Sequence, residues 1–207
     1  MRIILLLIQT LIIAAHLQAQ DTLYYFKSKE NELVGVKNQH GKIIIEANYP
    51  AGNNYYIFNK PIEEQTIEFY YLPNWEKIDF SKINVPFGAV YNREGKFLYT
   101  PLFYDNGPDY WNNDLRRYVE NNKVGLVNKN GVKITDAKWD MIWWSTIQGQ
   151  AQVFEGDLKS FYENGNEHLT IIGEAKTYII NLQGIRLSPD SLIKFERANS
   201  QFIIPRE

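Results

Sequence analysis

The chain has 207 residues, a formal net charge of −2 and no cysteine. Without cysteine no disulfide can form, so the stability of the fold has to come from packing. The balanced charge offers no basic face, and we therefore expect neither nucleic acid nor an anionic membrane surface as a partner. Aromatic residues make up 14% of the sequence, which is typical of β-strands and of binding surfaces.

The first residues predict a secretory signal peptide. Arg2 is followed by an apolar run over residues 3–15 and then by Ala19, a small residue that suits cleavage. The run is shorter than the roughly 20 residues that span a bilayer as a helix. We expect residues 1–19 to be removed on export to the periplasm or the medium, and residues 20–207 to form one domain with no membrane span and no lipid anchor. The alternative is an uncleaved N-terminal anchor.

The mature chain begins with strand signals. Residues 23–27 alternate weakly and predict an edge strand, and residues 33–45 predict a β-hairpin whose turn is Asn-Gln-His-Gly at residues 38–41. Asparagine can bond the backbone two residues on and glycine accepts a positive φ, so we expect a type I turn closed by a one-residue bulge. In that register Val36 lies opposite Ile44.

The same turn pattern recurs along the chain. Applying the same register to each copy gives further aliphatic pairs: Val90 with Leu98 around residues 92–95, Leu126 with Ile134 around 128–131, and Ile179 with Leu187 around 181–184. A weaker copy at residues 162–165 pairs Ser160 with His168. The chain is therefore predicted to be a hairpin array with insertions.

The insertions carry weaker signals. Residues 66–72 predict a strand, residues 75–83 fit a short helix or a loop, and residues 104–117 predict a long exposed loop because they are rich in Gly, Pro, Asn and Asp. Near the end, residues 188–191 suggest a one-turn helix and residues 201–204 a last strand. Together these patterns predict an all-β fold, an array of antiparallel hairpins in a twisted open sheet or solenoid, with few or no helices after the signal peptide.

Two stretches carry a family resemblance. KVGLVNKNG at residues 123–131, followed by VKI and KWDMI, resembles the WG repeat of bacteria, and residues 33–49 resemble it too. Val34 and Val124 stand where the family has tryptophan, so these units are divergent. The resemblance implies a β-hairpin array in an exported protein, with no shared catalytic residue.

Aromatic side chains supply the candidate binding site. Tyr110 and Trp111 lie in the predicted exposed loop and Trp143 and Trp144 in a later strand, all near Asn and Asp. An aromatic ring packs on the apolar face of a sugar while amides and carboxylates bond its hydroxyls. We expect Trp111 and one ring of the Trp143-Trp144 pair to contact a ligand. The alternative is that Trp139, Trp143 and a tyrosine fill the core.

Metal and catalytic signals are weak. His40 and His168 lack the spacing of a transition-metal site, and the oxygen-rich residues of the 104–117 loop fit no calcium-binding pattern, so we expect no metal and no cofactor. Those loop residues are Asp105, Asn106, Asp109, Asn112, Asn113 and Asp114. No GxSxG motif occurs. The sequence thus predicts an exported, non-catalytic binding module for a protein or glycan; the alternative is a small secreted carbohydrate-active enzyme that uses paired carboxylates.

Overall fold

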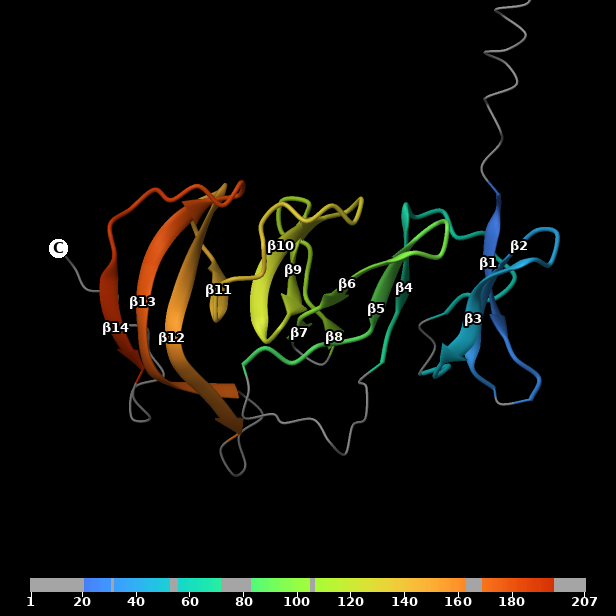
Figure 1. The fold of residues 1–207 in the computed structure, drawn as a ribbon, viewed down its shortest axis with the longest axis horizontal. Helices are drawn as coiled ribbons and strands as arrows, with labels where there is room; N and C mark the ends of the chain where they lie inside the picture. The colour runs from blue at the N-terminus through green and yellow to red at the C-terminus, as the bar shows by residue number, and fades with distance from the viewer. Residues whose placement is uncertain are drawn as a thin grey trace, which may run out of the picture.

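The computed structural model describes residues 21–30, 32–52, 56–71, 83–104, 107–162 and 169–195. Every regular element in these ranges is a β-strand, which confirms the predicted all-β fold. The sheets are antiparallel and follow one another along the molecule from the N-terminal to the C-terminal end (Figure 1). Several predictions lie outside the described residues: the signal peptide, the 75–82 segment, the turn at 163–165, His168 and the 201–204 strand.

The N-terminal sheet contains the first hairpin. Its strands are β1 (Leu23–Lys27), β2 (Val34–Asn38) and β3 (Ile43–Tyr49), in the order β1-β2-β3. The predicted edge strand is therefore correct. Val34, Val36 and Ile45 are buried on the face that packs against Ile67 and Phe69 of the next sheet.

The central sheet has the order β10-β9-β6-β5-β4. Its strands are β4 (Thr66–Phe69), β5 (Ala89–Asn92), β6 (Phe97–Pro101), β9 (Leu115–Glu120) and β10 (Lys123–Asn128). Between β6 and β9 the chain forms a small two-stranded sheet of β7 (Phe103–Tyr104) and β8 (Gly107–Pro108). Val90, Tyr99, Tyr118 and Val127 form the core of this unit.

The C-terminal sheet has the order β11-β12-β13-β14. Its strands are β11 (Met141–Trp144), β12 (Gln150–Tyr162), β13 (Leu169–Asn181) and β14 (Ser191–Phe195). Trp139, which has 0% exposure, packs between this sheet and β10 and donates its indole N–H to the Tyr178 hydroxyl at 2.8 Å. The expectation that Trp139 fills the core is therefore correct.

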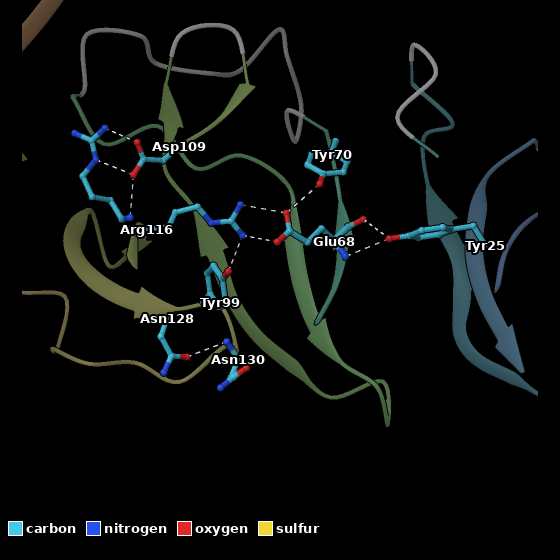
Figure 2. Close-up of polar contacts among 9 residues, drawn as sticks. Tyr25, Glu68, Tyr70, Tyr99, Asp109, Arg116, Asn128 and Asn130 are labelled. Carbon is cyan, nitrogen blue, oxygen red and sulfur yellow. Dashed lines mark hydrogen bonds and ion pairs between the residues drawn. The ribbon is translucent and has the colours of Figure 1, made fainter. Parts of the chain in front are cut away.

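The predicted turns form as expected. In each one the glycine N–H donates to the carbonyl of the asparagine that opens the turn, at 2.9 to 3.1 Å, and the glycine φ lies between +76° and +82°. The Asn128 side-chain oxygen accepts the N–H groups of Asn130 and Val132, both at 3.0 Å (Figure 2). The turns of the four hairpins follow one another along the upper edge of the molecule in Figure 1.

In the first two hairpins the predicted register is wrong by one residue beyond the turn. Lys37 pairs with Ile43 as expected, but a β-bulge then places Val36 opposite Ile45 rather than Ile44. Val90 likewise lies opposite Tyr99 rather than Leu98. The bulge inserts one residue into the second strand. As a result Ile45 enters the core beside Val36 while Ile44 still packs against the same cluster.

In the third and fourth hairpins a side-chain hydroxyl takes the place of one backbone hydrogen bond at the end of the ladder. Ile134 donates its N–H to the Leu126 carbonyl and Leu187 donates to the Ile179 carbonyl, both at 2.8 Å. The next ladder bond is replaced: Thr135 Oγ1 accepts the Leu126 N–H at 2.9 Å. Ser188 Oγ accepts the Ile179 N–H at 2.8 Å. Threonine and serine thus occupy the repeat position that Ile45 and Tyr99 occupy in the first two hairpins.

Three further expectations are wrong. Within the predicted exposed loop 104–117, Asp109, Arg116 and Arg117 are buried and β9 already begins at Leu115. Residues 188–190 form no helix and lead directly into β14. Ser160 lies opposite Ile171 rather than His168, because β12 and β13 continue as one long ladder.

Candidate ligand-binding site

The four aromatic residues singled out in the sequence line one hollow. Its volume is about 390 Å³, and Tyr110, Trp111, Trp143 and Trp144 share its wall with Tyr104, Asp109, Asn112 and Arg117. β7, the segment between β8 and β9, β9 itself and β11 supply these residues. Residues far apart in the sequence meet here, and Arg117 of β9 is bonded to the Ile142 carbonyl of β11.

An ion pair forms the inner wall of the hollow. Asp109 is 2% exposed and Arg117 is 5% exposed. The Asp109 carboxylate accepts the Arg117 backbone N–H at 2.9 Å, the Nε–H at 2.9 Å, and a second guanidinium N–H on its other oxygen. The Arg117 guanidinium also donates to the Ile142 carbonyl of β11 at 2.8 Å. This set of bonds ties β9, β11 and the segment after β8 together.

The aromatic rings are arranged around this guanidinium. The Arg117 guanidinium carbon lies 4.7 Å from the Tyr104 ring centre and 6.0 Å from the Trp144 ring centre. Tyr104 and Tyr110 meet edge to face, with 5.8 Å between ring centres. Cation–π contacts of this kind hold the rings in place. Trp144 Nε1 is buried and has no hydrogen-bond partner among the described residues.

Trp143 and Trp144 face different parts of the core. Trp143 packs against Met141 and Phe154 of the C-terminal sheet, whereas Trp144 packs against the cluster around Trp139. Successive residues of a strand point to opposite sides, as expected for β11. Both rings are half-buried, and both still border the hollow.

Arg116 holds Trp111 from the opposite side of β9. The Arg116 guanidinium carbon lies 4.3 Å from the Trp111 ring centre. Its guanidinium donates to both oxygens of Glu68, at 2.7 and 3.1 Å, and to the Tyr99 hydroxyl at 2.6 Å (Figure 2). Burial alone would lower the pKa of Arg116, but the Glu68 carboxylate beside it raises that pKa above its ordinary value. Arg116 is therefore a permanent cation under the Trp111 ring.

Glu68 extends this network toward the N-terminal sheet. Tyr70 donates its hydroxyl to the Glu68 carboxylate at 3.1 Å, and Tyr25 of β1 donates to the Glu68 carbonyl at 2.9 Å (Figure 2). A second hollow of about 530 Å³ lies on this side. It is bordered by Tyr25, Glu68 and Tyr70, and also by Trp111, which therefore lies at the border of both hollows.

Alkaline pH should destabilise this tyrosine-rich core. Burial raises the pKa of Tyr99 to about 12, although the Arg116 guanidinium opposes the shift; burial also raises the pKa of Tyr56 to about 12. Above the ordinary tyrosine pKa of 10.0 the unfolded chain releases protons that the folded chain retains. Stability is therefore complete below that pH and falls by about 1.4 kcal/mol per pH unit for each such tyrosine.

Urea unfolding across the alkaline range measures this effect. The free energy of unfolding should fall as the pH rises from 10.0 toward about 12, and Tyr99→Phe should flatten the slope. A slope that is the same in Tyr99→Phe and in the parent chain would contradict the assignment to Tyr99.

The oxygen-rich loop residues do not assemble into one group. Asp109 is bonded to Arg117, Asp114 pairs with Lys129 at 2.5 Å, and Asn112 accepts a hydrogen bond from Asn113. Asp105 and Asn106 lie outside the described residues, as does His168. His40 lies in the first turn, 3.1 Å from the Gln39 side chain. Over the ranges that the structure covers, no three His, Cys, Asp or Glu side chains are close enough to share a metal ion.

Sequence reasoning missed the charged residues of the site. The LRRYVE stretch of β9 offered one signal, since arginines beside Leu115 and Tyr118 fit an alternating strand better than a loop. No sequence signal connects Arg116 to Glu68, which is 48 residues away. Such a pairing exists only after β4 and β9 have entered the same sheet.

Comparison with known proteins does not test these assignments. Within the described ranges, no helix has the length and apolar character needed to cross a bilayer. No family model, no curated protein and no solved structure matches the chain. The similarity to the WG repeat thus stays a prediction from the sequence.

Proposed function

We propose that this chain is an exported, non-catalytic binding module that takes an uncharged saccharide in the hollow between β7, β9 and β11. The observation that carries the proposal is the convergence of Tyr110, Trp111, Trp143 and Trp144 on one hollow of about 390 Å³. Flat rings pack on the apolar faces of a sugar, and a few polar groups orient it.

The charge of the hollow favours a neutral ligand. Among the described residues, Asp109 and Arg117 are its charged lining residues, and they neutralise each other through paired hydrogen bonds. An anionic ligand would have to compete with Asp109 for the guanidinium. The Asn112 side chain supplies a polar group at the wall without adding charge.

The same ion pair argues against catalysis in this hollow. A glycosidase needs two carboxyl groups that flank the bond to be cleaved. Among the described residues, Asp109 is the carboxylate that borders the hollow, and both of its oxygens are bonded to Arg117. The enzyme alternative therefore has no specific observation in its favour, and we propose binding without turnover.

Saccharide retention tests the proposal. The secreted full chain should be retained on at least one of a set of immobilised polysaccharides, with peptidoglycan, chitin, cellulose and xylan as the probes. Tyr110→Ala combined with Trp144→Phe should weaken retention about tenfold, because each change removes a contact of about 1 kcal/mol or less. Tyr110 is 57% exposed and Trp144→Phe replaces the indole by a smaller aromatic ring that still packs at the same place, so the thermal midpoint should change little.

Control variants distinguish binding in the hollow from nonspecific adsorption. Phe97→Ala removes an aromatic side chain that is 50% exposed on β6 and does not border the hollow, so it should leave retention unchanged. Equal loss in the Phe97 variant, or retention of the double variant at the parent level, would contradict the site. Release of soluble sugar from the bound polysaccharide would contradict the non-catalytic assignment.

A further inference from the structure

The turn glycines mark how consecutive hairpins stack. A methyl group added at Gly95 would lie 2.5 Å from the carbonyl oxygen of Ile44. One added at Gly131 would lie 2.3 Å from Leu98 Cδ1, and one at Gly184 would lie 2.6 Å from Thr135 Cγ2. The second, third and fourth turns thus each press against the hairpin before them.

The contacted residue lies three or four positions after the turn glycine of its own hairpin. Ile44 and Leu98 lie three residues after the turn glycine of their own hairpins, and Thr135 lies four residues after Gly131. The stacking contact is therefore one interface repeated along the array. The second, third and fourth turns thus each lie over the chain that follows the turn of the preceding hairpin.

At the two ends of the array this interface has no neighbouring hairpin among the residues that the structure describes. Gly41, the first turn glycine, is exposed, and an added methyl group there would meet none of the described atoms within 4 Å. At the other end Leu187, three residues after Gly184, is 51% exposed, whereas the corresponding Ile44, Leu98 and Ile134 are half-buried.

We propose that copies of this chain associate head to tail, with the Gly41 turn of one copy seated on the Leu187 end of the next. A second copy of the chain fits this surface because of the repeat. The first hairpin exposes its turn, and the fourth hairpin exposes the surface that the next turn covers inside the array. Burying Leu187 and its neighbours favours the contact. Since the two surfaces differ, the contact is heterologous and extends into open chains unless the rotation closes a ring.

Three end-specific variants test this interface. The secreted full chain should show a molar mass that rises with concentration in light scattering or sedimentation. Leu187→Asp blocks one end through an exposed side chain. Gly41→Asn blocks the other, because asparagine tolerates the φ of +82° while adding a polar side chain. Ile43→Asp, at a side chain that is 46% exposed, provides a second variant of the Gly41 end. Each variant alone should be monomeric.

Mixing the variants gives the decisive result. Leu187→Asp retains its Gly41 end and Gly41→Asn retains its Leu187 end, so an equimolar mixture should form a heterodimer and nothing larger. Interior controls should assemble like the parent chain. Val132→Asp changes an aliphatic side chain that is 55% exposed, and Gly149→Asn changes a glycine at φ +81° with open space around it. A parent chain that stays monomeric, assembly of either end variant alone, or a mixture without heterodimer would overturn the proposal.

Discussion

Replacing Asp109 by alanine should lower the free energy of unfolding by about 3–5 kcal/mol, the cost of leaving a buried charge without its partner. The side chain of Arg117, which is 5% exposed, would stay buried with one remaining hydrogen bond, to the Ile142 carbonyl. It would lose three hydrogen bonds to the carboxylate, one of them from its own backbone N–H. The hollow between β7, β9 and β11 would lose its inner wall at the same time.

Urea unfolding followed by tryptophan fluorescence measures this cost. The matched control is Glu120→Ala, which breaks an ion pair with Lys133 whose side chains are 51% and 36% exposed, and which should cost less than about 1 kcal/mol. Asp109→Leu combined with Arg117→Met should recover much of the loss, because an apolar pair leaves no charge buried. A cost for Asp109→Ala that is no larger than that of the control would show that the pair is hydrated.

Substituting valine at the turn glycines should produce a graded loss of stability. Gly41, Gly131 and Gly95 share nearly the same φ, at +82°, +76° and +81°, so the strain of a β-branched residue, about 1–3 kcal/mol, is common to all three. At Gly41 this strain is the whole effect. At Gly131 the new side chain also meets the flexible end of Leu98, and at Gly95 it meets the backbone carbonyl of Ile44.

Denaturation midpoints of the three variants measure the stacking separately from the strain. We expect Gly41→Val to be the mildest and Gly95→Val the most damaging, since a backbone carbonyl cannot rotate out of the way. Gly149→Val serves as the reference, because its φ of +81° has open space around it. Equal losses at Gly41 and Gly95 would mean that the hairpins do not press on one another in solution.

The local turns were predictable from the sequence, whereas the strand register beyond them was predicted only in part. The Asn-x-x-Gly turns formed where the sequence predicted them, because their hydrogen bonds and φ angles involve only neighbouring residues. In the first two hairpins the pairs beyond the turn were wrong by one residue, whereas in the third and fourth Ile134 and Leu187 bond their predicted partners Leu126 and Ile179. The bulge that shifts Val36 from Ile44 to Ile45 depends on which of these side chains meets the core of the adjoining sheet.

The candidate site shows the same division. Tyr110, Trp111, Trp143 and Trp144 were recognisable as residue types, and the structure brings all four to one hollow. The loop that holds the first two was expected to be solvated, yet it contributes the buried Asp109.

By itself the sequence determined the strand-forming pattern, the positions of the turns and the choice of aromatic side chains, since period-two alternation and turn chemistry act over a few residues. Only the tertiary structure decided the register after each bulge, the burial of Arg116 and Arg117, and the meeting of β11 with the segment before β9. The physical reason is that burying a charge or inserting a residue becomes favourable only when a partner from a distant strand is already in place.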